Sequence, residues 1–273
     1  MSYSRELSLD SKPLIGVVHL PPLPGSPGWR GGSLEDIVER ALKDARSLEE
    51  GGVDAIIVEN YGDAPYAIRV REPETIAAMA IVVREVVRSV SLPVGVSLLR
   101  NSGPEAVAIA AVTGATFIRV NAFCEPRVAP EGLLEPVARE TMLKARSLAW
   151  RGKILADVDV KHSLPLASGY DPRWALRETL HRCKPDAVIA SGARTGEAPE
   201  PGYIAALRST APGAKILVGS GVTPENIRLY WRLADGFIVG TYFKVGGVTT
   251  NPVDKKRVEA FVRVVRELRS RGA

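Results

Sequence analysis

Two hydrophobic patterns alternate along this chain. Short, nearly continuous apolar runs, which are typical of buried parallel strands, are separated by longer segments whose apolar residues lie three and four positions apart, as on one face of a helix. Strand-like runs are expected at residues 14–20, 53–60, 93–99, 116–121, 153–160, 187–191, 216–218 and 237–239. This regular alternation predicts a parallel sheet with helices outside it.

The helical segments carry their own start and stop signals. Ser33 is expected to cap the first helix, and Gly51 and Gly52 are expected to end it. After the seventh strand, Thr223 is expected as an N-cap, with Pro224 in the first helical position. Further helices are expected at residues 74–89, 104–112, 172–182, 201–209 and 253–270, with another that ends near residue 150.

Eight strand–helix units fit the α/β fold class, as a single (β/α)8 TIM barrel. We assign the barrel to residues 13–273 and expect residues 1–12 to form an N-terminal arm or cap. An open, doubly wound sheet is the alternative, and it would require a glycine-rich phosphate-binding turn after the first strand. Here His19 is followed by Leu-Pro-Pro-Leu-Pro, which suits such a turn poorly.

Composition and charge narrow the class of protein. The chain has 273 residues, 45% hydrophobic and 25% charged, which suits one large α/β domain. No apolar run approaches the ~20 residues that span a bilayer, and residues 1–12 lack a signal-peptide core, so we expect a cytoplasmic protein without a membrane partner. The net charge of +5 comes from basic residues interleaved with acidic ones, which argues against nucleic acid as a partner. Glutamine is absent, which favours a thermophilic source.

The two cysteines, Cys124 and Cys183, are too few for a disulfide framework or a cysteine-rich metal site. Cys124 has no histidine partner evident from the spacing, so we expect it to be inert rather than nucleophilic. The Asp, Glu and His residues near the strand ends could hold a divalent cation, but no zinc-binding spacing is present. We therefore leave the cofactor unknown and do not favour a metal.

The seventh and eighth strands each end in glycine and a small hydroxyl residue. Gly219, Ser220 and Gly221 follow one strand, and Gly240 and Thr241 follow the other. Phosphate held by the loops after the last two strands recurs in (β/α)8 barrels, and glycine lets the backbone approach a ligand closely. We therefore expect these residues to bind phosphate. The alternative is that the glycines serve tight packing alone.

The other strands end in polar residues, at the end of the barrel where chemistry is located in this fold. In the fifth strand Asp157, Asp159 and Lys161 share one face by alternation, so all three are expected to line the barrel mouth. They suit acid–base or metal chemistry, and Lys161 could be a proton shuttle, a Schiff-base nucleophile or a phosphate clamp. The alternative is a layer of salt bridges that fills the barrel.

Three further strand ends complete the expected catalytic set. Glu59 follows the second strand and is expected to be a base, or else a partner of Arg119 or Lys161. Arg119 suits recognition of a carboxylate or phosphate, and His19 ends the first strand. The remaining strand-end residues are expected to contact the ligand: Asn60, Arg100, Asn121 and His162.

Five segments together resemble the BtpA family. They are GVVHLPPLPGSP (16–27), GGVDAIIVENYGDAP (51–65), FIRVN (117–121), ADVDVKH (156–162) and VGSGVTPEN (218–226). The resemblance covers about residues 13–265 and implies a barrel of the ribulose-phosphate-binding type. It also implies a link to photosystem I biogenesis or stability in photosynthetic members, whereas similar proteins of other organisms are described as sugar-phosphate enzymes. The resemblance supplies no catalytic residues, so the candidate residues rest on their positions.

We therefore expect an enzyme of the aldolase, isomerase or decarboxylase type, a lyase or isomerase, that acts on a small phosphorylated metabolite. The alternative is a non-catalytic assembly or stability factor for a protein complex. That role predicts an exposed apolar patch, and the loop at residues 21–32, with Leu23 and Trp29, is the expected place for it. A homo-oligomer is compatible with either role.

Overall fold

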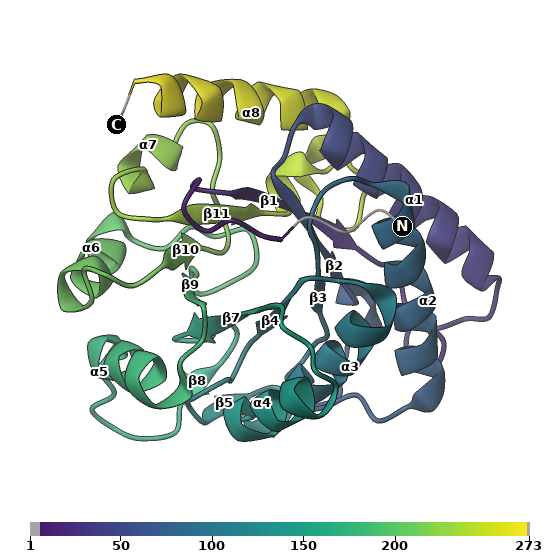
Figure 1. The fold of residues 1–273 in the computed structure, drawn as a ribbon, viewed down its shortest axis with the longest axis horizontal. Coiled ribbons are helices and arrows are strands. Elements are labelled where there is room, and N and C mark those ends of the chain that lie inside the picture. Colours follow the sequence, from purple (N-terminus) through teal and green to yellow (C-terminus); the bar gives the residue numbers. More distant parts are fainter. Residues whose placement is uncertain (1–5, 272–273) are drawn as a thin grey trace.

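The computed structural model describes residues 6–271, and within them parallel strands close into a barrel surrounded by helices (Figure 1). The fold class expected from the sequence, a (β/α)8 TIM barrel, is confirmed. The barrel strands, in their order around the barrel, are β1 (Leu14–His19), β2 (Ala55–Glu59), β3 (Val94–Ser97), β4 (Phe117–Val120), β7 (Lys153–Val158), β9 (Ala187–Ala190), β10 (Ile216–Val218) and β11 (Gly236–Val239). Residues 1–5 of the expected N-terminal arm lie outside the described residues.

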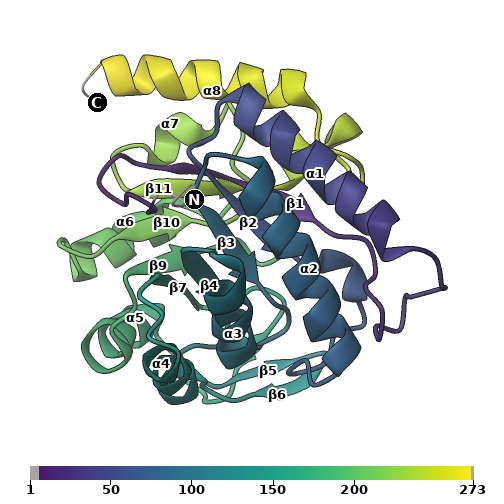
Figure 2. The ribbon, with the colours of Figure 1, turned by 45° about the vertical axis from the view of Figure 1, so that its right-hand side comes forward.

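Helices cover the outside of the barrel on all sides (Figures 1 and 2). They are α1 (Leu34–Gly51), α2 (Pro73–Ser89), α3 (Gly103–Thr113), α4 (Ala138–Ser147), α5 (Pro172–Glu178), α6 (Pro201–Thr210), α7 (Ile227–Tyr230) and α8 (Lys255–Ser270). The first and last helices, α1 and α8, pack side by side and so close the ring. Within residues 6–271, no helix is long and apolar enough to cross a membrane.

The caps expected for the first helix are present. The Ser33 hydroxyl accepts a hydrogen bond from the Glu35 N–H, and Gly52 ends α1 with a φ of +95°. At that angle a residue with a side chain would be strained, so glycine is the suitable residue for this C-cap.

The barrel interior is a core of its own, separate from the core between the sheet and the helices. Its side chains come from alternate residues of the strands, such as Ile15, Ile57 and Phe117. Leu7 and Leu9, which precede β1, belong to the same cluster and are 2% and 8% exposed. The N-terminal segment therefore contributes apolar side chains to the inside of the barrel, and the polar residues gather at the other end.

The sequence did not predict a small antiparallel sheet that lies beside the barrel mouth. It consists of β5 (Arg127–Ala129), β6 (Gly132–Leu134) and β8 (Leu164–Pro165), in the order β6, β5, β8. The expected long helix after the fourth strand is consequently shorter and is represented by α4 alone. These strands have only two or three residues each, which is too few for a period of two to be recognised.

The helix expected to begin at Thr223 is regular only from Ile227, although Thr223 makes the hydrogen bonds of a helix start. Residues 223–226 form a turn in which the Thr223 N–H donates to Asn226 Oδ1, and regular helix starts only at Ile227. The resulting α7 has four residues. The Thr223 carbonyl accepts a hydrogen bond from the Ile227 N–H at 3.0 Å, as at the start of a helix, and the Asn226 side chain caps the Thr223 N–H.

A disulfide bond joins Cys124 to Cys183, across 59 positions of the chain. Cys124 is therefore not a free thiol, in agreement with its expected lack of nucleophilic reactivity, but the pairing itself was not predicted. The two residues approach because Cys124 follows β4 at the barrel end and Cys183 ends the π-helical turn Thr179–Cys183 that extends α5. Only the tertiary structure brings them together.

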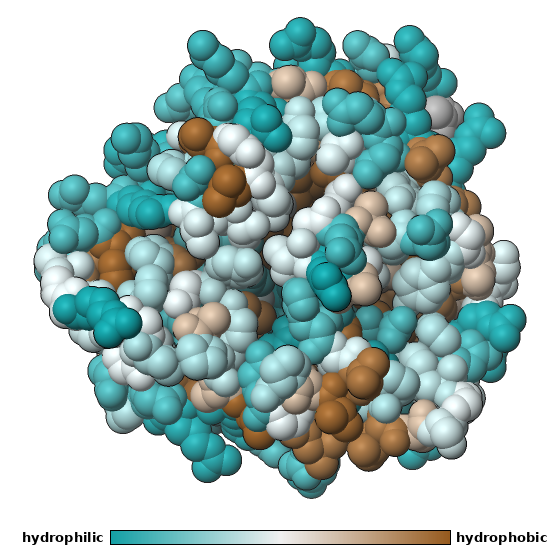
Figure 3. Space-filling model, turned by 180° about the vertical axis from the view of Figure 1, so that it is seen from behind, coloured by the Kyte–Doolittle hydropathy of each residue, from teal (hydrophilic) through white to brown (hydrophobic). Residues whose placement is uncertain are grey.

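The exposed apolar patch expected in the loop at residues 21–32 is not there. Leu23 is fully buried and Trp29 packs against the core. The apolar side chains that do face solvent include Val128, Leu133 and Leu164, which are 43%, 43% and 69% exposed and lie opposite one another on β5, β6 and β8. In Figure 3, apolar residues gather at the lower edge of the molecule, the region of this small sheet.

Candidate functional site

A pocket of about 300 Å³ opens at the C-terminal ends of β2, β3, β4 and β7. It is lined by Glu59, Tyr61, Ala64, Tyr66, Leu99, Arg100, Arg119, Asn121, Pro130, Glu131, Lys161, His162 and Thr195. Six of these residues were expected from the sequence to be catalytic or to contact a ligand. The closed barrel therefore brings together polar residues that lie more than a hundred positions apart.

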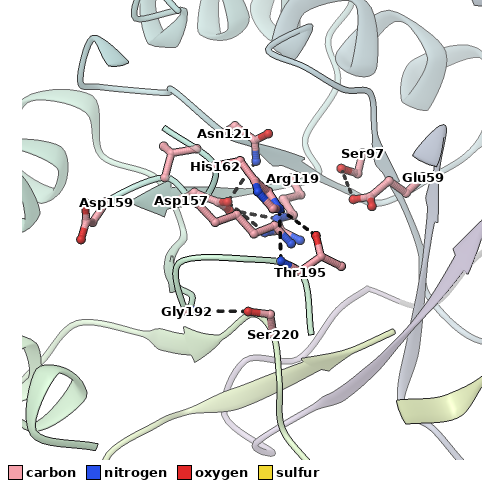
Figure 4. A network of polar contacts seen from close by, with 12 residues as sticks. Glu59, Ser97, Arg119, Asn121, Asp157, Asp159, His162, Gly192, Thr195 and Ser220 are labelled. Carbon is pink, nitrogen blue, oxygen red and sulfur yellow. Dashed lines mark hydrogen bonds and ion pairs between the residues drawn. The ribbon is translucent and has the colours of Figure 1, made fainter. Parts of the chain in front are cut away.

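A buried ion pair borders this pocket (Figure 4). Arg119 donates from Nε and Nη2 to the two carboxylate oxygens of Asp157, at 2.9 Å each. The Asn121 amide donates to the same carboxylate at 3.0 Å, and its oxygen accepts from Arg100 at 3.0 Å. Because Asp157 already accepts three hydrogen bonds, it is held as the partner of Arg119. The salt-bridge alternative from the sequence thus describes this pair well.

Glu59 has one carboxylate oxygen engaged and one available. Its Oε2 accepts from the Ser97 hydroxyl at 2.9 Å, whereas Oε1 lies 3.6 Å from His19 Nε2, beyond hydrogen-bond distance. Burial, together with the nearby Lys244 and Lys161, holds the pKa of His19 well below its usual value. His19 is therefore a neutral neighbour at physiological pH.

Lys161 follows β7 and reaches the same pocket. Its carbonyl accepts from Arg100 Nη2 at 2.5 Å, but no hydrogen bond or ion pair of its amine is found within residues 6–271. Burial lowers the pKa of the amine to about 8, Arg119 adds to this effect, and Glu59 opposes it. About a tenth of these amines are uncharged at pH 7, far more than for an ordinary lysine.

The expectation that Asp159 shares a face with Asp157 and Lys161 is wrong. Strand β7 ends at Val158, and Asp159 has a φ of +54°, so the alternation of side chains stops there. Its carboxylate pairs instead with Arg127, at 3.0 Å, and Figure 4 shows it pointing away from the other rim residues. The backbone N–H of Asp159 is held by Glu125 at 2.7 Å.

Of two residues expected to contact the ligand, Asn60 lies away from the pocket and His162 lines it. Asn60 is fully buried and hydrogen-bonds with Asp63 and with the backbone of Leu99, so it braces two loops and does not line the pocket. His162 does line the pocket, and its Nε2 accepts from the Thr195 N–H at 3.1 Å. Burial and the adjacent Lys161 lower the pKa of His162.

The five residues expected to bind phosphate converge as predicted. Gly219, Ser220, Gly221, Gly240 and Thr241 line a second, smaller cavity, which also touches Lys161 and Arg119. Its volume is only about 30 Å³, roughly the space of one water molecule. Thr195 and Gly196 also line it, and a cavity of this size admits a phosphate group only if a lining segment such as this one moves.

The glycine at position 221 is required by packing whether or not a ligand binds. A Cβ atom there would lie 2.0 Å from the Ala198 nitrogen, and the φ of Gly221 is +68°. The Ser220 hydroxyl donates to the Glu197 carbonyl at 2.8 Å and so fastens the same covering segment. The packing alternative therefore accounts for Gly221 by itself, whereas the phosphate role of the turn stays a prediction.

Sequence reasoning missed four polar residues of the larger pocket: Tyr61, Tyr66, Glu131 and Thr195. Tyr61 directly follows Glu59 and Asn60, so its place after a strand end was a usable signal. Glu131 lies in the turn of the unpredicted β5–β6 hairpin, so no sequence signal could place it. Within residues 6–271, no group of three or more His, Cys, Asp and Glu residues could hold a metal ion.

Comparison with known sequences identifies relatives along nearly the whole chain. The BtpA family model matches residues 10–267. An uncharacterized protein of Pyrococcus abyssi is 46% identical over 263 residues, which cover 96% of this chain and 99% of the relative. The photosystem I biogenesis protein BtpA of Synechocystis is 39% identical over 255 residues, which cover 93% of this chain and 88% of the relative.

Comparison with solved structures shows the same barrel in sugar-phosphate enzymes. The native KDPGal structure superimposes with a TM-score of 0.54 at 18% identity, and covers 99% of this chain and 100% of that one. The 2-keto-3-deoxy-6-phospho-gluconate aldolase of Zymomonas mobilis gives a TM-score of 0.53 at 12% identity, with 95% and 96% covered. At these identities the likeness concerns the fold alone.

Proposed function

The chain belongs to the BtpA family, and from this premise we propose that it is an enzyme that acts on a small phosphorylated metabolite at the mouth of its barrel. The reaction is of the aldolase, isomerase or decarboxylase type, in which a bond beside a carbonyl group is broken or shifted with proton transfer. We place the enzyme in the cytoplasm of a thermophilic organism.

One observation carries this proposal. Glu59 Oε1 and Lys161 Nζ face the pocket without a hydrogen bond to any residue in the range 6–271, whereas Arg119 and Asp157 satisfy each other. Neither atom is among the fully buried ones, so both can be reached by a molecule in the pocket. A carboxylate and an amine left unpaired in one pocket are therefore best explained by a ligand that pairs with them.

The two unpaired groups suit proton transfer. Glu59 is held through Ser97, so its free oxygen has a fixed position from which it can accept a proton. Lys161 exchanges a proton near neutral pH because the pKa of its amine is about 8. Arg100 and Arg119, which also line the pocket, would bind an anionic part of the substrate.

The phosphate would bind at the turns formed by Gly219–Gly221 and Gly240–Thr241, next to this pocket. Lys161 and Arg119 line both cavities, so a ligand in the larger one could extend its phosphate into the smaller one. Thr195 and Gly196 would have to move to admit it. The names of the similar solved structures, which include a phospho-gluconate aldolase and phosphoribosyl anthranilate isomerases, support a phosphorylated substrate of this size.

A thermal-shift screen tests the proposal. The protein is heated with inorganic phosphate, sugar phosphates, nucleotides and the same sugars without phosphate. A ligand at ~100 times its dissociation constant stabilises by about 2.7 kcal/mol, enough to be seen. We expect a shift with a phosphorylated sugar that Lys161→Ala removes and Lys153→Ala, at the other end of β7, retains. If no phosphorylated compound shifts the melting temperature, the proposal fails.

A second candidate function, an assembly or stability factor for a protein complex, is favoured by the apolar face of the β6–β5–β8 sheet. The name of the Synechocystis relative supports it as well. This role predicts that a partner protein co-purifies with the Glu59→Gln variant but not with the Leu133→Ser/Leu164→Ser variant. Co-purification of the tagged variants from the source cells would distinguish the two roles.

A further inference from the structure

The structure contains two lysines whose amines have the same lowered pKa but very different surroundings. For Lys161 and Lys244 alike, burial lowers the pKa to about 8. Lys244 is fully enclosed, donates to the Val17 carbonyl at 2.9 Å and lies 3.6 Å from Asp44. The Lys161 amine opens into the pocket and has no such partner within residues 6–271. Lys244 is thus the buried partner of Asp44 and has a structural role, whereas the amine of Lys161 is accessible to a small molecule.

The groups around Lys161 suit chemistry at its nitrogen. Glu59, with its free Oε1, lines the same two cavities as Lys161 and can accept or return a proton. Asp157 holds Arg119 in place, and the positive charge of Arg119 helps to lower the pKa of the Lys161 amine. An uncharged amine in a partly closed pocket is a nucleophile for carbonyl carbon.

A second observation indicates the kind of substrate. Arg100 is 4% exposed and lines the pocket, and its Nε has no hydrogen-bond partner within residues 6–271. This buried Nε atom lies 3.6 Å from a Glu131 oxygen, with which it forms an ion pair. Arg100, Arg119 and Lys161 nevertheless outnumber the acidic Glu59 and Glu131 in the pocket lining, which favours a substrate that carries a carboxylate or phosphate.

We propose that Lys161 binds its substrate covalently, as an imine between Nζ and the carbonyl carbon of an aldehyde or ketone that carries an anionic group. This inference rests on the proposed function, because it assigns the substrate class of the same pocket.

The step balances without any further reactant. The lone pair of the neutral amine forms the C–N bond while the C=O π bond opens, and the resulting oxygen anion takes a proton from the nitrogen through Glu59. Loss of the second nitrogen proton to Glu59 and its transfer to the hydroxyl group release one water molecule and leave the C=N bond. Nothing is oxidised or reduced.

Reductive trapping tests this imine. The protein is incubated separately with pyruvate, dihydroxyacetone phosphate, glyceraldehyde 3-phosphate or acetone, each with sodium cyanoborohydride, and the adduct is located by peptide mass spectrometry. We expect one adduct on Lys161 with an anionic carbonyl compound and little with acetone. At pH 7 the neutral fraction of Lys161 exceeds that of an ordinary lysine by more than about a hundredfold, so Lys153 and Lys255, whose side chains are 33% and 44% exposed, serve as internal controls.

The probe that is trapped identifies the class of substrate. Trapping by pyruvate alone would assign a 2-oxo acid, and trapping by either phosphate ester would assign a phosphorylated carbonyl compound. Glu59→Gln should slow trapping without moving the adduct, and Lys161→Arg should abolish it while melting like the wild type. Equal labelling of Lys153 and Lys255, or none on Lys161 with any probe, would overturn the imine.

The outcome is separable from that of the proposed function. A thermal shift with a phosphorylated sugar but no adduct would leave the enzyme proposal standing and remove the imine. If pyruvate forms the adduct but no phosphorylated compound stabilises the protein, the imine stands and the proposal of a phosphorylated substrate fails.

Discussion

At the scale of single residues, the charges at the barrel mouth divide into those that are paired and those that are free. Arg119 and Asp157 are 5% and 2% exposed and hold each other by two hydrogen bonds. Glu59 Oε1 and Lys161 Nζ, in contrast, have no hydrogen-bond partner within residues 6–271. The sequence identified all four by their positions on or just after a barrel strand, but position could not distinguish the paired groups from the free ones.

The Arg119–Asp157 pair predicts a large loss of stability when it is broken. Arg119→Ala leaves the Asp157 carboxylate buried without its cation, which typically costs 3–5 kcal/mol, about as much as a strongly destabilising core mutation. Urea denaturation measures the difference. Arg173→Ala, which removes an exposed pair with Asp171, is the matched control and should have little effect. A loss for Arg119→Ala as small as that of the control would show that the pair is open to solvent.

His19 predicts an acid-sensitive stability. Burial, together with Lys244 and Lys161, lowers its pKa in the folded protein, whereas in the unfolded chain it titrates near 6.5. The unfolded chain therefore binds more protons below pH 6.5, and the free energy of unfolding falls as the pH falls below that value.

Denaturation from pH 7 to pH 5 should show this fall in the wild type and a smaller one in His19→Asn. His181→Asn, at an exposed histidine, should retain the wild-type slope. Parallel curves for wild type and His19→Asn would contradict the assignment.

At the scale of elements, the strands and most helices were predictable and the inserted segments were not. The barrel strands are continuous apolar runs, and a capped helix such as α1 carries its own signals in Ser33 and Gly52. The side chain of Asp159 points away from the pocket because of tertiary contacts with Arg127 and Glu125, and the β5–β6 hairpin likewise forms only in the folded protein. Periodicity contains no information about such contacts.

The disulfide between Cys124 and Cys183 joins the loop after β4 to the turn that extends α5. It closes a loop of 59 positions, and the loss of chain entropy in the unfolded state predicts about 4 kcal/mol of stabilisation. The Cys124→Ser/Cys183→Ser variant should be less stable by about that amount in urea under oxidising conditions. Its stability should equal that of the reduced wild type. Titration of two free thiols in the unreduced native protein would contradict the bond.

At the scale of the whole molecule, the barrel has one apolar end and one polar end. Leu7 and Leu9 join the inner core, and the charged residues gather at the opposite mouth. The fold followed from the sequence because the strand–helix unit repeats along the chain. The substrate did not follow, because the pocket also depends on Tyr66, Glu131 and Thr195, which come from loops.

The inner position of Leu7 predicts that the N-terminal segment stabilises the barrel. Leu7 is 2% exposed, so Leu7→Ala should cost about 2–5 kcal/mol through lost burial and an unfilled cavity. Leu166→Ala, at a side chain that is 57% exposed, is the control and should be nearly neutral in the same denaturation experiment. A neutral Leu7→Ala would mean that this segment leaves the barrel end open in solution.

The central claim is that the barrel mouth binds a small phosphorylated metabolite. The most direct measurement is a crystal structure of the protein grown with the phosphorylated compound that raises its melting temperature most. The account predicts the phosphate against the turns at Gly219–Gly221 and Gly240–Thr241, Thr195 and Gly196 displaced, and the carbon chain between Glu59 and Lys161. A phosphate bound outside the mouth, or a mouth that keeps Thr195 in place and holds no ligand, would contradict it.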